Sequence, residues 1–165
     1  MTADGFAGRP DRRIQISNEA TAIHAHQLRH SEQAIMVGAG TIITDNPRLN
    51  IRHLNGNHPI RIIIDPKGKI NPDDNFHIFD GTQRTLLFTS NVQPQFPNTE
   101  IYEISNDKIS PIGLAAQLAQ LKIDSVLIEG GPSLQQSFLT AALWDECFIY
   151  QSQQLLATGI AAPPL

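Results

Sequence analysis

Residues 125–139 read SVLIEGGPSLQQSFL, and this stretch predicts a strand, a sharp turn and a helix in direct succession. The apolar run before Glu129 is short and rich in branched side chains, which favours a buried strand over a helix. Gly130 and Gly131 permit the sharp turn, and Pro132 suits the first position of a helix. Because strands and helices alternate in the same way along the rest of the chain, the sequence predicts an α/β domain with a mostly parallel sheet.

The other elements are placed by caps and by apolar runs. A helix is expected over residues 17–31, where Ser17 and Asn18 can cap the first amides, and another from Pro111 to Leu121 behind the cap Ser110. A third should occupy residues 132–143, and residues 41–48 should form a loop or a short helix. Strands are expected at residues 34–37, 61–65, 85–89, 101–104, 125–129 and 146–151.

Composition narrows the class of protein. The chain has 165 residues, of which 41% are hydrophobic, enough for one domain with one core. Its net charge of -4 argues against nucleic acid as a partner. No apolar run is long enough to span a membrane and no leader is recognisable, so a cytoplasmic protein is expected. The one cysteine, Cys147, lies in an apolar run and is predicted to be a core residue.

The turn at Gly130 and Gly131 is a candidate anion site. Glycines let an anion approach the backbone, and the free amides of a helix N-terminus supply partial positive charge. A tight strand-to-helix turn without a ligand explains the glycines equally well. Glu129 would stand at the carboxyl end of its strand, where it could hold a sugar hydroxyl or transfer a proton.

Other patterns are weaker. The stretch from Val37 to Thr41 lacks the third glycine of a dinucleotide fingerprint, because position 43 is Ile43, and it lacks a P-loop lysine. Arginines that could clamp a phosphate, or could simply be solvated surface charges, are Arg29, Arg48, Arg52 and Arg61. His26 and His30 are four residues apart but have no third ligand in sight, so no metal is assigned.

Four motifs in order together resemble one family. They are IMVGAGT at residues 35–41, DNPRL at 45–49 with Arg52, PIRIIID at 59–65 and LIEGGP at 127–132. They resemble the reductase domain of the bifunctional riboflavin-biosynthesis deaminase/reductase, and the likeness runs from Asp4 to Glu146. It implies a fold similar to dihydrofolate reductase, in which helices flank a largely parallel twisted sheet.

The resemblance also implies a reaction. NADPH would reduce the ribosyl group of 5-amino-6-(5-phosphoribosylamino)uracil to the ribitylamino product, so the expected partner is a phosphorylated ribosylaminopyrimidine. The opened glycosylamine is an imine, and protonating its nitrogen makes C1′ a better hydride acceptor. Two alternatives stay open: another reductase of this fold, and a non-catalytic fragment that binds a nucleotide or a phosphosugar.

Site residues follow from the matched positions. Glu129 is implied as the catalytic acid and as a substrate ligand. Further substrate ligands would be Arg29, Leu49, Arg52 and Arg13, and the cofactor would contact Gln15, Thr41, Asp45, Pro66, Gly131, Pro132, Ser133, Leu134, Gln135, Gln136 and Ser137. Arg13, Gln15 and Pro66 depart from the residues that are common in the family, which are a small hydroxyl residue, tryptophan and serine.

The family pattern extends beyond both ends of this sequence. It has a strand with a lysine before Asp4, a final β segment after Gln151 and a separate deaminase domain. Residues 1–165 are therefore expected to be a single reductase domain without those parts, and an open sheet edge favours pairing of two copies into a homodimer.

Overall fold

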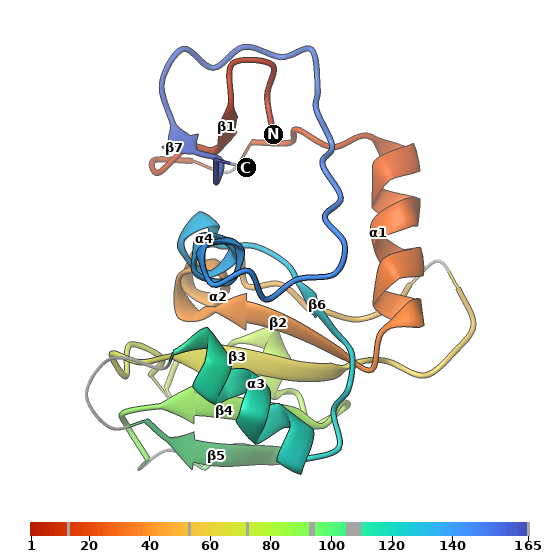
Figure 1. Cartoon of the computed structure of the whole chain (residues 1–165). Coiled ribbons are helices and arrows are strands. Elements are labelled where there is room, and N and C mark those ends of the chain that lie inside the picture. The colour runs from red at the N-terminus through yellow and green to blue at the C-terminus, as the bar shows by residue number, and fades with distance from the viewer. Residues whose placement is uncertain (13, 53, 72, 93–94, 105–109, 165) are drawn as a thin grey trace.

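A five-stranded parallel sheet forms the centre of the molecule in the computed structural model, which describes residues 1–164 except 13, 53, 72, 93–94 and 105–109. The strand order is β5-β4-β3-β2-β6, and every neighbouring pair is parallel. The strands are β2 (Ala34–Gly38), β3 (Ile60–Asp65), β4 (Thr85–Thr89), β5 (Thr99–Glu103) and β6 (Val126–Ile128). These five were expected from the sequence, and the sheet is seen in Figure 1.

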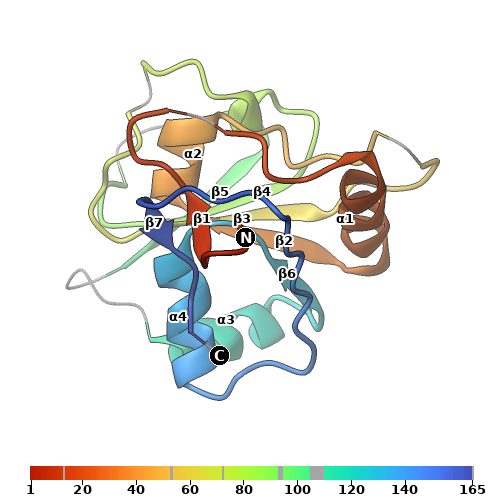
Figure 2. The same ribbon diagram turned by 90° about the horizontal axis from the view of Figure 1, so that it is seen from above.

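Alternate residues of each strand pack on opposite faces of the sheet. Met36, Ile62 and Leu86 belong to one buried cluster, together with side chains of the helices α3 (Pro111–Gln120) and α4 (Pro132–Thr140). Their chain neighbours point the other way, toward α2 (Ala39–Asp45) and the short 3-10 helix η1 (His77–Phe79). Figure 2 shows α2 on one side of the sheet and α3 and α4 on the other. The layered α/β architecture is as predicted.

Local signals fix where the helices begin. The helix α1 (Glu19–Ser31) is capped by Asn18, whose side chain accepts a hydrogen bond from the amide of Thr21. Ser110 caps α3 in the same way, through the amide of Gly113, and Pro111 follows at the first helical position. Both caps were predicted.

A second, two-stranded sheet joins the ends of the chain. The strands β1 (Phe6–Gly8) and β7 (Ile160–Ala161) pair in antiparallel fashion above the main sheet (Figure 1). Neither strand was expected, because each has at most three residues and is held by a partner more than 150 residues away.

The strand predicted at residues 146–151 is wrong. This segment follows an extended path, but its backbone bonds go to the first residues of the chain: the amino group of Met1 donates to the Tyr150 carbonyl, and the amide of Ser152 donates to the Met1 carbonyl. Among the described residues no strand lies along the outer edge of β6, so the apolar run bonds the N-terminal residues and adds no strand to the sheet. Phe148 and Cys147 are consequently exposed, and the prediction that Cys147 is a core residue is wrong as well.

Arg61 is neither a surface charge nor a phosphate clamp. Its side chain is fully buried at the start of β3 and is bonded within the protein.

The described helices include none that is long and apolar enough to cross a membrane.

Candidate active site

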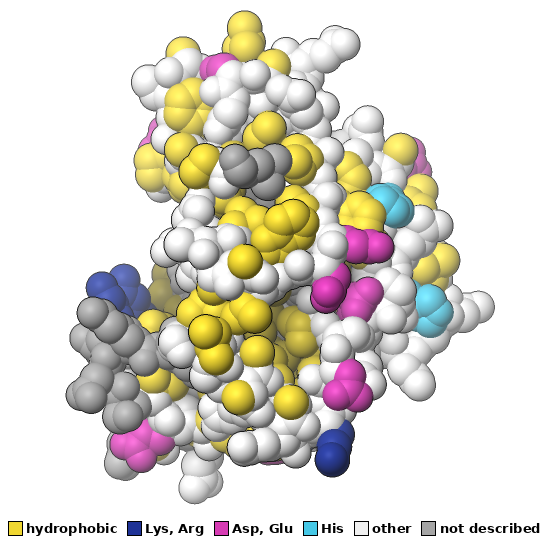
Figure 3. All heavy atoms as spheres, in the orientation of Figure 1, with side chains coloured by type: hydrophobic (Ala, Val, Ile, Leu, Met, Phe, Trp, Pro, Cys, Tyr) yellow, Lys and Arg dark blue, Asp and Glu magenta, His cyan; other side chains and the backbone are white. Residues whose placement is uncertain are grey.

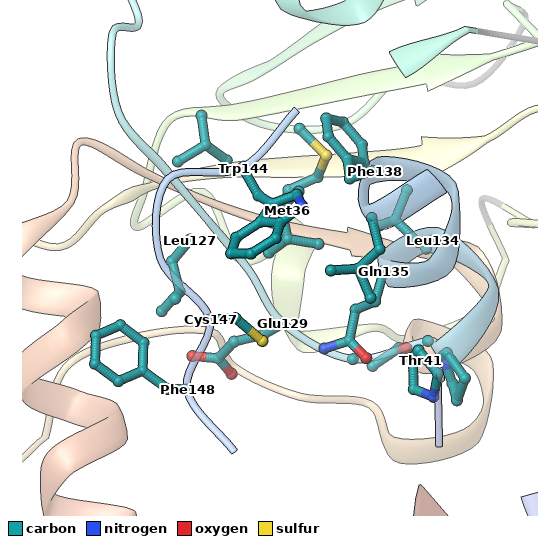
Figure 4. Close-up of a pocket in the computed structure, with 18 of the residues that line it drawn as sticks. Met36, Thr41, Leu127, Glu129, Leu134, Gln135, Phe138, Trp144, Cys147 and Phe148 are labelled. Carbon is teal, nitrogen blue, oxygen red and sulfur yellow. The ribbon is translucent and has the colours of Figure 1, made fainter. Parts of the chain in front are cut away.

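A large cavity opens between β6, α4 and the segment that follows α4. Its volume is about 2710 Å³, well above the roughly 300–1,000 Å³ of an ordinary small-ligand pocket. Figure 4 shows apolar side chains among its lining, from Met36, Leu127, Phe138, Trp144 and Phe148. A space of this size fits an extended ligand of dinucleotide size.

The glycine turn lies at one end of the cavity, against α2. Gly130 and Gly131 both have positive φ values, +68° and +78°, which other residues rarely adopt. A side chain at Gly130 would meet Thr41, whose Cγ2 lies 3.0 Å from the ideal Cβ position. No side chain caps α4, so the backbone around Gly131 and Ser133 meets the cavity without a side-chain partner among the described residues. This arrangement is suited to an anion.

An ion pair connects α1 with the end of β6. Arg29 holds the Glu129 carboxylate with two hydrogen bonds, Nε to Oε1 at 2.7 Å and Nη2 to Oε2 at 2.6 Å. Its third nitrogen, Nη1, donates to the Asn50 carbonyl at 3.2 Å. The side chains are 15% and 25% exposed, which leaves the carboxylate within reach of a ligand while the bidentate pair fixes its orientation.

A phenol lies near this ion pair. The Tyr150 hydroxyl is 2.5 Å from Nδ1 of His24 on α1. Burial raises the pKa of Tyr150 above its usual range, and the negative charge of Glu129 raises it further. Tyr150 is therefore a neutral hydroxyl at physiological pH.

The charged side chains that line the cavity are acidic. Glu129, Asp45, Asp124 and Glu146 are among the lining residues, and no lysine or arginine is among those that the structure describes. Figure 3 shows acidic side chains beside an apolar surface on this face of the molecule. An anionic group bound at the glycine turn would therefore depend on backbone amides and hydroxyls, and the guanidinium of Arg29 is already paired with Glu129.

Most residues predicted to contact a cofactor gather in this cavity. They come from α2, the end of β3 and the start of α4, which the parallel sheet brings to one edge. Those that line it are Thr41, Asp45, Pro66, Gly131, Pro132, Ser133, Leu134, Gln135 and Ser137. Gln15 and Gln136 lie outside this lining: Gln15 donates to the Ser17 carbonyl, and Gln136 to the Thr140 hydroxyl.

The predicted substrate residues are more scattered. Glu129 lines the cavity. Arg29 is not part of the lining, but it is bonded to the Glu129 carboxylate. Leu49 is buried on the far side of the sheet with the α2 cluster, and Arg52 is exposed outside the cavity. Arg13 lies outside the described residues.

Sequence reasoning missed the apolar wall and the segment after α4. Met36 and Leu127 were recognised only as strand residues, and nothing local distinguishes a strand residue that lines a cavity from one inside a core.

Among the described residues, no group of three or more His, Cys, Asp or Glu side chains is placed to hold a metal ion.

Comparison with known proteins agrees with the fold and the motifs. A family model described as the RibD C-terminal domain matches residues 1–156. The riboflavin biosynthesis protein RibD of Bacillus amyloliquefaciens is 35% identical over 91% of this chain and 42% of its own length. A Buchnera aphidicola protein named 5-amino-6-(5-phosphoribosylamino)uracil reductase is 29% identical over 91% of this chain and 79% of its own.

Solved structures give the same result. A Thermotoga maritima protein titled as a diaminohydroxyphosphoribosylaminopyrimidine deaminase and 5-amino-6-(5-phosphoribosylamino)uracil reductase has a TM-score of 0.83 and 26% identity, over 98% of this chain and 45% of that one. The Saccharomyces cerevisiae riboflavin biosynthesis reductase Rib7 has a TM-score of 0.64 and 26% identity, over 84% and 62%. This chain thus spans less than half of the RibD proteins described above. The expected dihydrofolate-reductase-like α/β fold is confirmed, and the chain belongs to the RibD C-terminal domain family.

Proposed function

We propose that this chain reduces the ribosyl group of 5-amino-6-(5-phosphoribosylamino)uracil to the ribitylamino product, with NADPH as the hydride donor. One observation carries the proposal: the uncapped glycine turn at the start of α4 and Glu129, which Arg29 holds, line the same cavity. Family membership supports it, because a relative that this chain covers over 79% of its length is named for this reduction.

The residues around the glycine turn fit a nicotinamide dinucleotide. The bare backbone at Gly131 and the free start of α4 would hold a phosphate group, and Thr41 offers a hydroxyl beside them. Thr41 and Gly130 pack so closely that a side chain at Gly130 would displace this hydroxyl. When bound, the cofactor supplies a hydride; the protein supplies alignment and a dry apolar wall.

Glu129 and Arg29 would act on the sugar. The opened glycosylamine is an imine, which takes one hydride at C1′ and one proton at nitrogen to become an amine. Glu129 would hold a ribose hydroxyl or relay that proton, and the fork of Arg29 would keep the carboxylate turned toward the sugar. Arg52 remains the proposed contact for the 5-phosphate.

Turnover with defined substrates tests the proposal. The protein should oxidise NADPH when the phosphoribosylaminouracil is added and should give a product two hydrogens heavier. Glu129→Gln should lower kcat by about 100-fold or more while NADPH binding persists. Glu100→Gln, which breaks the exposed pair between Arg84 and Glu100 of β5, is the matched control and should leave kcat unchanged.

The two rival functions give other results. Oxidation of NADPH with dihydrofolate but not with the phosphoribosylaminouracil would support another reductase of this fold. Binding of NADPH or of the pyrimidine without any oxidation would support a non-catalytic binding fragment.

A further inference from the structure

Arg61 is a fully buried charge near the start of a largely apolar strand. It stands between Ile60 and Ile62 at the start of β3, and its side chain is 1% exposed. Its guanidinium is bonded on every side: Nε and Nη2 donate to the Arg48 carbonyl at 3.1 and 2.9 Å, and Nη1 donates to the Ile78 carbonyl at 2.8 Å. The same Nη1 lies 3.0 Å from Oδ1 of Asp80.

A buried guanidinium adds little to the free energy of unfolding, even when all its hydrogen bonds are made. Removing a guanidinium from water costs free energy that its bonds barely recover, and a well-packed apolar residue of similar volume is often as stable or more so. The neighbouring positions of β3 are isoleucines, so an apolar residue would suit this strand. The function of Arg61 therefore lies in what it holds.

Arg61 holds the carbonyl of Arg48, the first residue of a segment whose backbone is contacted by side chains at four consecutive positions. After the Arg48 carbonyl, the Leu49 carbonyl lies 3.5 Å from Nε2 of Gln83, the Asn50 carbonyl accepts from Arg29, and the Ile51 amide donates to Nδ1 of His58 at 3.2 Å.

These tethers hold the segment in an unusual backbone conformation. Leu49 has a φ of +50°, in the left-handed region that a leucine rarely adopts. No helix or strand covers these residues, so the side-chain bonds determine its shape.

We propose that Arg61 is a positioning residue for the substrate side of the active site. It fixes the Arg48 carbonyl, which sets the path of the chain through Asn50 to Arg52. The Asn50 carbonyl then receives Nη1 of Arg29, whose other two nitrogens orient Glu129. This inference rests on the proposed function, because it assigns Glu129 and Arg52 to the substrate. Arg61 itself touches no ligand.

The test is Arg61→Lys, which keeps the charge but removes the fork that grips the Arg48 carbonyl. We expect the amides of residues 48–52 to exchange hydrogen faster while those of β2 and β4 keep their protection. We also expect KM for the phosphoribosylaminouracil to rise about 10-fold or more, since small misplacements of binding groups are costly, with the Kd of NADPH unchanged. Arg84→Lys, in the exposed pair with Glu100, is the matched control and should change neither quantity.

Gln83→Met provides a second variant if Arg61→Lys does not fold. It removes the Nε2 that donates to the Pro59 carbonyl at 3.0 Å and lies 3.5 Å from the Leu49 carbonyl, and it also removes a buried Oε1 that has no hydrogen-bond partner, which offsets part of the loss. It should likewise raise KM and loosen residues 48–52.

Two results would overturn the inference. An unchanged KM in a folded variant would show that Arg61 and its segment serve stability alone, as would exchange that accelerates evenly across the sheet. A wild-type protein that does not turn over the pyrimidine would remove the proposed function and this inference together, and is recognised without any variant.

Discussion

Asp80 is the carboxylate that compensates the buried charge of Arg61. Burial alone would raise the pKa of Asp80, but hydrogen bonds from Arg61 and Thr82 outweigh it and hold that pKa well below its usual range. Because the folded-state pKa lies below the unfolded value of about 3.9, Asp80 contributes its full stability above about pH 5. That contribution is lost as the pH falls through the unfolded value toward the folded one.

Asp80→Asn should therefore destabilise the protein in a pH-dependent way. At pH 7 we expect the free energy of unfolding to fall by about 1.5–3 kcal/mol, the range for hydrogen bonds to charged groups. The difference from wild type should shrink steadily below about pH 4, where the wild-type carboxylate gains a proton. Urea unfolding at a series of pH values measures this, with the exposed Asp73→Asn as the control. An equal loss at neutral and acidic pH would contradict the account.

Single residues were the hardest to predict from sequence. Glu129 and the glycines were identified because their chemistry depends on chain neighbours: a strand before and a proline after. The role of Arg61 depends on carbonyls 13 and 17 residues away, and the Arg29–Glu129 pair joins residues 100 positions apart. Local sequence carries no signal for either arrangement.

At the level of elements, α1 matters because its last turn carries Arg29. Its first turn is closed by a reciprocal pair: Asn18 Oδ1 accepts from the Thr21 amide, and the Asn18 amide donates to the Thr21 hydroxyl, both at 3.0 Å. Asn18→Ala should lower the free energy of unfolding by about 1 kcal/mol. Asn18→Asp keeps an acceptor beside the helix N-terminus and should cost little. Chemical denaturation compares the two variants, and equal losses would argue against the cap.

Elements with local signals were predicted well. The five strands of the main sheet are short branched runs bounded by turns, and the helices α1, α3 and α4 begin at recognisable caps or at a proline. The segment at residues 146–151 has the same apolar character but is not a strand, because its backbone bonds go to the first residue of the chain and not to the outer edge of β6. An apolar run in the sequence shows which residues could form a strand. It does not show which part of the chain their backbone will bond.

On the scale of the whole molecule, no strand among the described residues pairs with the outer edge of β6. Val126, Leu127 and Ile128 are only partly buried, whereas most residues of β2, β3 and β4 are buried. An apolar edge with free backbone groups is a template for pairing. We therefore predict that the protein forms homodimers through this edge.

Sedimentation velocity over a range of concentrations tests the dimer. Leu127→Lys places a charge on the edge strand and should shift the protein toward monomer. Ile112→Lys, on an exposed face of α3, is the matched control and should not. A wild-type protein that stays monomeric at every concentration would contradict the prediction.

A cytoplasmic location and a single reductase domain over residues 1–165 also remain predictions.

The central claim is that the glycine turn at the start of α4 holds a phosphate of NADPH. Fluorescence titration of NADPH into wild type, Gly131→Asp and Gly131→Asn tests it most directly. Asparagine and aspartate have nearly the same shape and both tolerate positive φ better than most residues, so the two variants differ chiefly by one negative charge. The account predicts that wild type binds, that Gly131→Asn binds more weakly and that Gly131→Asp loses about 10-fold or more beyond that, since like charges at a desolvated site repel strongly. Equal affinity of the two variants, or no binding by wild type, would contradict it.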